Sequence, residues 1–147
     1  MIYVPIAIFA AVVLVLAGLS LMGRRPPKTG LVDGRLRPCP GTPNCVSSDV
    51  EGGHSAWIRP FAFEGSPEAA WQRLAQAVEA IGGTIRADTG DYLWATFTSR
   101  IFRFVDDVEL RMDGEDRVIH VRSESRVGYS DLGVNRKRVE RLRGAFE

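Results

Sequence analysis

The pattern of apolar and polar positions divides the chain near residue 23. Ile2–Met22 is a run of 21 residues without a charge, whereas short apolar and polar groups alternate from Leu31 to the end. At about 1.5 Å per residue, a helix of the first segment spans roughly 30 Å, the thickness of the hydrocarbon core of a bilayer. This predicts a transmembrane anchor over residues 1–23, a linker over residues 24–35 and one domain over residues 36–147.

A cleaved signal peptide is the alternative for the first segment. No basic residue precedes the apolar run, the run is long for a signal peptide, and no small-residue cleavage motif stands before Gly23. We therefore expect a retained single-pass anchor, with the membrane as a partner through Ile2–Met22.

Within the domain, two segments have the spacing of amphipathic helices. The first opens with Ser66-Pro67-Glu68, which supplies a capping residue, a proline and a first-turn carboxylate, and it stops at Gly82-Gly83. The second begins near Asn135. The residues expected to face the core are Trp71, Leu74, Val78 and Ile81 in the first helix and Val139, Leu142 and Phe146 in the second. Those expected to point largely outward are Arg136, Lys137, Arg138, Arg141 and Arg143.

The alternation typical of β-strands occurs in four other segments, although Pro60 restricts the first of them to a sheet edge or a bulge. These segments are 57–63, 92–99, 105–112 and 117–125. Their shared apolar face needs a cover, which the helices can provide. We predict an α+β fold, in which an N-terminal transmembrane helix is followed by a two-layer antiparallel sheet with two helices packed on one face.

The domain carries little net charge. Residues 31–147 contain 16 basic and 18 acidic side chains, which gives a formal charge of −2. Nucleic-acid binders normally have a basic excess. We therefore expect no nucleic-acid partner.

Two features give opposite indications of the side of the membrane on which the domain lies. The basic residues Arg24, Arg25 and Lys28 follow the apolar run, which favours the cytoplasm under the positive-inside rule. Cys39 and Cys45 bracket a turn-rich stretch that can bring two sulfur atoms together. Such a disulfide contributes about 2 kcal/mol in the chain-entropy model and needs an oxidising compartment. The residues alone leave the side open.

Several motifs follow one another along the domain. They are Cys39-Pro40, Asn44-Cys45-Val46-Ser47-Ser48, residues 104–109 (FVDDVE), residues 122–131 (RSESRVGYSD) and residues 133–138 (GVNRKR). In this order they resemble the domain-of-unknown-function family 1499 (DUF1499), over about Leu36 to Arg143. The resemblance implies a small domain that often stands behind a membrane or export signal, and it implies no established activity. That background favours an extracytoplasmic domain in the cell envelope.

The charged residues of the C-terminal third allow a structural interpretation. Asp106, Asp107 and Glu109 cluster on one strand, and Arg122 on the next strand is placed to meet Asp107 or Glu109 across the sheet. An ion-pair network would then connect the strands to the last helix through Arg126, Arg136 and Arg138.

The same region also predicts an anion-binding site. The N–H groups at the start of the last helix attract negative charge, and arginine side chains suit phosphate or carboxylate. The candidate ligand-binding residues are Arg122, Arg126, Tyr129, Asn135, Arg136 and Arg138. The expected partner is an anionic lipid headgroup, an anionic envelope metabolite or an envelope protein.

A divalent-metal-dependent hydrolase is the alternative function. Asp106, Asp107, Glu109 and Asp131, with His120, offer oxygen and nitrogen ligands, but their spacing matches no established metal motif. We predict no bound metal and no cofactor. The preferred prediction is a non-catalytic binding or accessory module, while catalysis stays open.

Overall fold

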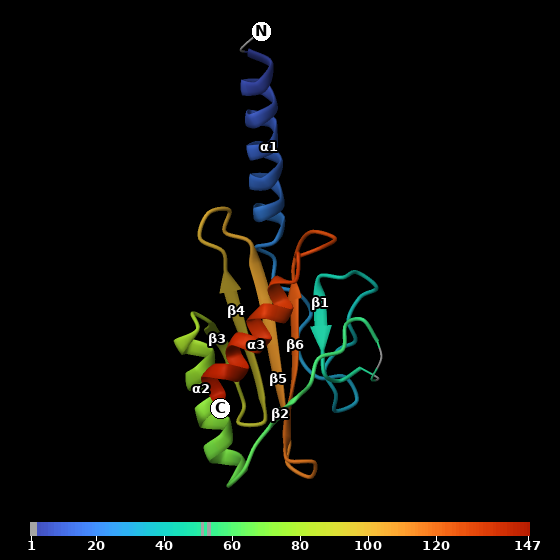
Figure 1. Cartoon of the computed structure of the whole chain (residues 1–147), viewed down its shortest axis with the longest axis vertical. Coiled ribbons are helices and arrows are strands. Elements are labelled where there is room, and N and C mark those ends of the chain that lie inside the picture. Colours follow the sequence, from blue (N-terminus) through green and yellow to red (C-terminus); the bar gives the residue numbers. More distant parts are fainter. Residues whose placement is uncertain (1–2, 51, 53) are drawn as a thin grey trace.

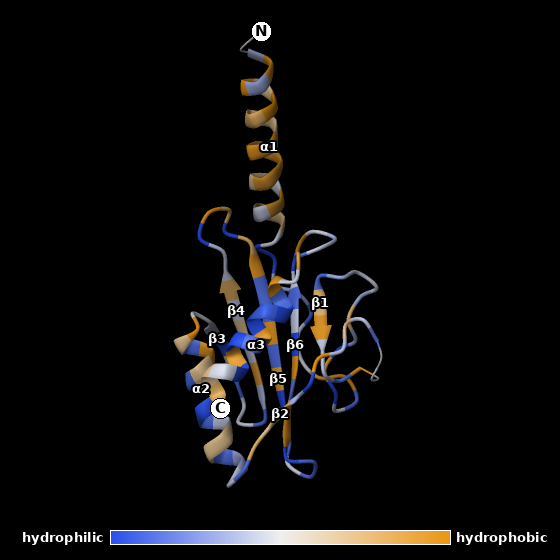
Figure 2. Ribbon diagram, viewed as in Figure 1, coloured by the Kyte–Doolittle hydropathy of each residue, from blue (hydrophilic) through white to orange (hydrophobic). Residues whose placement is uncertain are grey.

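The apolar N-terminal segment is one helix, α1 (Tyr3–Met22), that projects from the rest of the chain (Figure 1). The computed structural model describes residues 3–50, 52 and 54–147, so Ile2, where the predicted anchor begins, lies outside the described residues. Within these residues α1 is the one helix long and apolar enough to cross a membrane. Figure 2 shows that α1 is apolar along most of its length, as expected for a helix in contact with lipid.

The remainder of the chain is built on one antiparallel sheet. Its strands lie in the order β1-β6-β5-β4-β3, and β2 pairs with β6 along the same edge as β1. The strands are β1 (Cys45–Ser47), β2 (Phe61–Ala62), β3 (Thr84–Asp88), β4 (Tyr92–Thr98), β5 (Val105–Asp113) and β6 (Val118–Ser125).

Two helices, α2 (Pro67–Ala80) and α3 (Val134–Phe146), cover one face of the sheet (Figure 1). Ser66 caps α2 as predicted, because its hydroxyl oxygen accepts a hydrogen bond from the N–H of Ala69 at 3.2 Å. The core between the helices and the sheet contains the predicted apolar residues, among them Trp71, Leu74, Val78, Leu93, Val108, Leu110, Ile119, Val121, Val139, Leu142 and Phe146. The α+β prediction is confirmed.

The opposite face of the sheet is polar, yet it is also covered. Two stretches on either side of β1, around residues 23–36 and at Ser48 and Asp49, lie against it. They make hydrogen bonds with side chains of β4, β5 and β6 and with Arg126, which directly follows β6. As a result, Asp107 and Glu109 on this face are only 2 % and 0 % exposed. The segment 24–35, which was expected to act as a linker, therefore contributes to the folded structure.

Two local expectations were wrong. Of the strand expected over residues 57–63, only Phe61–Ala62 is a strand, because Pro60 has no N–H to donate to a ladder. Arg143 was expected to point outward but is buried. Its guanidinium donates to the carbonyl oxygens of Arg59 at 2.6 Å and Pro60 at 3.0 Å and lies over the ring of Phe61.

Candidate functional site

The carboxylate of Asp107, on the polar face of the sheet, is held by an arginine at close range. It accepts hydrogen bonds from Nε of Arg126 at 2.7 Å and from Nη2 at 2.8 Å, and a third from the indole of Trp94 at 2.8 Å. The remaining nitrogen of Arg126 donates to the carbonyl oxygen of Gly23 at 3.2 Å. This bidentate pair connects the sheet to the segment directly after α1.

Glu109, two residues further along β5, is buried among donors. It accepts hydrogen bonds from Arg122 at 3.0 Å, from the hydroxyl of Tyr92 at 2.6 Å and from the N–H of Gly30 at 2.8 Å. Arg122 pairs with Glu124 as well. Burial, together with the hydrogen bond and charge of Glu109, raises the pKa of Tyr92 well above its ordinary value. Tyr92 therefore stays protonated and remains a donor to Glu109.

A second polar cluster on this face, around Asp49, was not identified in the sequence. Arg111 donates to the two carboxylate oxygens of Asp49 at 3.2 Å and 3.0 Å, and the N–H of Leu36 donates at 2.8 Å. Burial alone would raise the pKa of Asp49, but these hydrogen bonds and the neighbouring positive charges outweigh it and lower the pKa. Asp49 is 62 residues away from Arg111 along the chain, so no local spacing indicates that they pair.

His120 belongs to the same cluster. Its Nδ1 atom lies 3.1 Å from the hydroxyl oxygen of Ser48 and 3.3 Å from Asp49. Burial lowers the pKa of His120 by more than the nearby charges of Asp49 and Asp113 raise it. A serine-histidine-aspartate relay needs the serine and the carboxylate on different ring nitrogens. Here Ser48 and Asp49 both lie on Nδ1, and the carboxylate nearest to Nε2, that of Asp113, is 4.0 Å away, which is too far for a hydrogen bond, so the three groups do not form such a relay.

On the helix side, Asn135 at the start of α3 is completely buried. It accepts a hydrogen bond from Ser123 at 2.6 Å and donates to the hydroxyl of Ser125 at 2.9 Å and to the carbonyl of Asn44 at 3.0 Å. These bonds connect α3 to β6 and to the residue before β1. One turn later, Arg138 forms an ion pair with Asp106 and lies 4.9 Å from the centre of the Phe97 ring.

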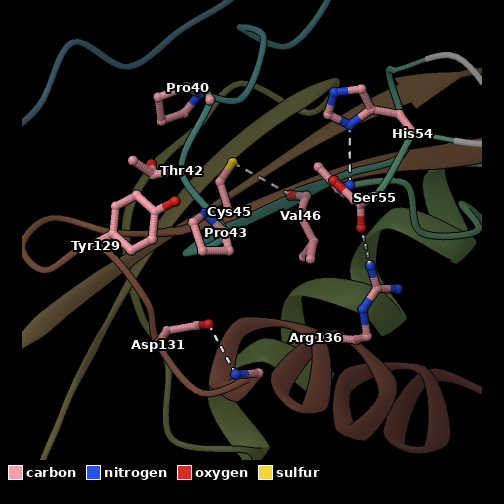
Figure 3. A pocket seen from close by; sticks show the side chains of 13 residues that line it. Pro40, Thr42, Pro43, Cys45, Val46, His54, Ser55, Tyr129, Asp131 and Arg136 are labelled. Atoms are coloured by element: carbon pink, nitrogen blue, oxygen red, sulfur yellow. Dashed lines mark hydrogen bonds between the residues drawn. The ribbon is translucent and has the colours of Figure 1, made fainter.

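The predicted ligand-binding residues therefore divide into two groups. Arg122, Arg126 and Arg138 are each paired with a carboxylate, and Asn135 is enclosed by protein groups. The other two residues, Tyr129 and Arg136, line a cavity of about 350 Å³ between the cysteine loop and the start of α3 (Figure 3).

Cys45 lines this cavity and forms a disulfide with Cys39, as predicted. Figure 3 shows Pro40, Thr42 and Pro43 of that loop on one wall, His54 and Ser55 on another, and Arg136 reaching in from α3. Arg136 is held in place because its Nη2 donates to the carbonyls of Ser55 and Trp57, both at 3.0 Å.

Asp131 also lines the cavity and acts as the cap of α3. Its carboxylate accepts hydrogen bonds from the N–H groups of Gly133 at 3.0 Å and Asn135 at 2.6 Å (Figure 3 shows the first). The start of α3 thus already holds a negative group of its own chain. Because the charge of Asp131 offsets that of Arg136, this cavity has no positive excess to attract an anion.

A second hollow, the basic cleft, has a different charge balance. It has a volume of about 620 Å³ and lies between the end of α2, the loop from β4 to β5, and α3. Its cationic side chains are Arg100, Lys137, Arg138 and Arg141, and its one carboxylate is Asp106, which already pairs with Arg138. Lys137 and Arg141 lie one turn apart on α3 and so share a face. Within the described residues, Arg100, Lys137 and Arg141 take part in none of the ion pairs.

The carboxylates proposed as metal ligands do not converge. Asp106 faces the helices, Asp107 and Glu109 face the opposite side of the sheet, and Asp131 lies in the loop before α3. In the part of the chain that the structure describes, no three His, Cys, Asp or Glu side chains are placed to hold a metal ion.

Residues 35–146, which include the disulfide, the cavity and the basic cleft, match the model of a family described as a protein of unknown function, DUF1499. The match covers most of the chain. The chain belongs to the DUF1499 family. No curated protein matches it in sequence. The boundaries agree with the resemblance noted from the motifs, which extended from about Leu36 to Arg143.

The DUF1499 region begins after α1 and after the first residues that cover the polar face. Gly23 and Gly30, which bond to Arg126 and Glu109, therefore lie outside the matched region although they complete the burial of two of its ion pairs. In this chain the segment between the helix and the DUF1499 region thus belongs to the same folded unit.

Proposed function

We propose that this chain is a membrane-anchored binding module whose DUF1499 domain holds an anionic group in the basic cleft. The observation that supports this function is the excess of positive charge in the cleft: Arg100, Lys137 and Arg141 face it without an acidic partner among the described residues. Phosphate and carboxylate groups are the ligands that such side chains recognise.

The placement of Arg141 favours binding over a purely solvated role. One end of its guanidinium donates to the carbonyl oxygen of Ile81 at the end of α2, which leaves its other N–H groups available to the cleft. A guanidinium held in this way loses less conformational entropy when it binds an anion. Lys137, one turn earlier, adds a mobile charge at the rim.

The proposed ligand carries a phosphate group, either in a lipid headgroup or in a soluble metabolite of the cell envelope. An extracytoplasmic position is supported by the Cys39–Cys45 disulfide, because such bonds persist in oxidising compartments. The basic residues after α1 favour the other side, and of the two arguments we give more weight to the covalent bond.

Titration of the full chain in zwitterionic nanodiscs with inorganic phosphate, followed by NMR of the backbone amides, tests the proposal. We expect saturable shifts at the residues around the cleft. Lys137→Gln and Arg141→Gln should each weaken the affinity about tenfold, because each removes one charge-assisted hydrogen bond worth roughly 1.5 kcal/mol.

Arg59→Gln is the matched control, since it removes one exposed positive charge outside the cleft. It should leave the affinity unchanged. Absence of saturable shifts in the wild-type chain, or equal weakening by all three substitutions, would show that the cleft is not an anion site. Repeating the titration with glycerol phosphate and with vesicles of phosphatidylglycerol separates a soluble ligand from a lipid headgroup.

A further inference from the structure

Two loops of the domain rise beside the base of α1. They are residues 99–104, between β4 and β5, and residues 126–133, between β6 and α3 (Figure 1). One groove of about 330 Å³ is lined at the same time by Leu16 and Leu19 of α1, by Phe104 of the first loop and by Ser130 of the second. Parts of both loops therefore lie level with helix residues that precede the end of α1 by about 9 Å.

The position of the two loops along α1 determines how close they come to a bilayer that the helix spans. The helix has 20 residues and spans about 30 Å, so it is just long enough for the hydrocarbon core and has no length to spare. If α1 fills the core, its C-terminal end lies at the edge of the hydrocarbon region. Loops beside Leu16 and Leu19 then reach through the headgroup layer to the membrane interface.

The loops carry side chains suited to that layer. Ile101 is 82 % exposed and Leu132 is 87 % exposed, and Figure 2 shows the apolar tip of the first loop beside the base of α1. Single exposed apolar residues are common on protein surfaces. Here, however, two of them occur on loops at the same end of the domain, together with Tyr129, which is 72 % exposed. Tyrosine is enriched at membrane interfaces.

Positive charge surrounds these apolar tips. Arg100 and Arg103 flank Ile101, and Arg24 and Arg25 follow α1 directly. All four side chains are exposed, and within the described residues they make no ion pair with an acidic side chain. Basic side chains close to a membrane surface are attracted to anionic lipids.

We infer that this end of the domain docks on the bilayer, with Ile101 and Leu132 inserted into the interface and the surrounding arginines against the phosphates of anionic lipids. The inference rests on the membrane anchor of the proposed function. Because Arg100 also lines the basic cleft, the docking is tested through Arg24, Arg25 and Arg103, which do not line the cleft. Docking fixes the orientation of the domain, because α1 and the two loops then contact the same surface. The turn between β5 and β6 points away from it (Figure 1).

Photo-crosslinking of the full chain in nanodiscs tests the docking. The amino acid p-benzoylphenylalanine replaces Ile101 or Leu132, with Leu14 in α1 as the positive control and Glu115 in the β5–β6 turn as the negative control. We expect lipid adducts at positions 14, 101 and 132 and none at position 115. The yield at position 101 should rise when phosphatidylglycerol is added to phosphatidylcholine, and Arg24→Gln, Arg25→Gln and Arg103→Gln together should abolish that rise.

Each other result contradicts a definite part of the inference. Adducts at position 14 but not at 101 or 132 would show that the loops stand clear of the lipid. Equal yields at 101 and 115 would show that the domain has no fixed orientation. If the adduct yield at position 101 did not change when phosphatidylglycerol was added, the proposed role of the arginines would be wrong. Absence of adducts at position 14 would overturn the anchor itself, whereas the phosphate titration reports on the cleft alone.

Discussion

Glu109 illustrates how much a single buried charge depends on its partners. The residue is 0 % exposed, and its carboxylate is paired with the guanidinium of Arg122 at 3.0 Å. Removing one partner of a buried ion pair is costly, because the remaining charge keeps its desolvation penalty without compensation. Loss of Arg122 would therefore leave Glu109 as an uncompensated buried charge.

We predict that Arg122→Met lowers the free energy of unfolding by about 3–5 kcal/mol. Chemical denaturation of the full chain in detergent micelles measures this. The double variant Arg122→Met with Glu109→Gln removes the unpaired charge and should be more stable than Arg122→Met alone. If the two substitutions were simply additive, the ion pair would not be coupled and this interpretation of the polar face would be wrong.

His120 is the residue through which the domain should respond to mild acid. It faces Asp49, Asp113, Arg111 and Ser48, and burial lowers its pKa below the ordinary value of 6.5. The folded state therefore binds a proton less readily than the unfolded state does. Its contribution to stability is fully present above pH 6.5 and is lost as the pH falls from 6.5 toward the lowered pKa.

The expected result is a decrease in the free energy of unfolding between neutral pH and about pH 5.5, and a smaller decrease in the His120→Gln variant. Denaturant titrations at the two pH values provide the comparison. Asp49 does not interfere in this range, because its pKa is lowered from 3.8 and it remains ionised. Identical pH dependence in both proteins would exclude His120 as the responsible group.

At the scale of elements, the turn after α2 depends on the absence of a side chain at Gly83. A Cβ atom there would lie 2.7 Å from Phe97, 2.7 Å from the Val78 side chain and 2.8 Å from the Val78 carbonyl oxygen. Gly83→Ala should therefore lower the free energy of unfolding by about 1–3 kcal/mol.

Gly144 in α3 is the matched control, since a Cβ atom there meets nothing within 4 Å. Gly144→Ala should raise the free energy of unfolding by about 0.5–1 kcal/mol, because alanine restricts the unfolded chain and favours a helix. Thermal melts of both variants and the wild type show whether each substitution lowers or raises the stability. A neutral Gly83→Ala would mean that α2 and β4 are less closely packed than described.

The helices and strands with a regular spacing of apolar residues were predictable from the sequence. Val108 and Leu110 on β5 and Ile119 and Val121 on β6 alternate with polar residues, so they identify the core face directly. Neither β1 nor β3 was predicted, and β1 has only three residues, too few to show an alternation. Its place at the sheet edge is set by pairing with Ser123 and its neighbours, nearly 80 residues away along the chain.

The candidate site was predictable only in part for a related reason. The sequence identified the charged residues, and Arg122 does meet Glu109 across the sheet as proposed. The sequence did not show which arginine side chains have an acidic partner and which do not. The pairing depends on residues far apart in the sequence, such as Asp49, and on backbone donors, such as the N–H of Gly30. Neither kind of contact can be predicted from local spacing.

For the whole molecule, the short segment between the anchor and the domain has a structural role. Gly23 and Gly30 bond to side chains of the sheet, so α1 and the DUF1499 domain are joined by a fixed path. If α1 spans a bilayer, as we propose, this path keeps one end of the domain next to the membrane. Arg100 would then belong both to a loop beside the lipid and to the lining of the basic cleft.

We propose that the membrane-held domain lies on the extracytoplasmic side, and labelling of Cys39 and Cys45 tests this proposal most directly. A membrane-impermeant thiol reagent is added to spheroplasts of an expressing bacterium, with and without reductant, and the label is measured in the membrane fraction. We expect no label before reduction and labelling from outside after it, with the chain in the membrane pellet. Thiols that react without reductant, and only after lysis, would place the domain in the cytoplasm and overturn the proposal.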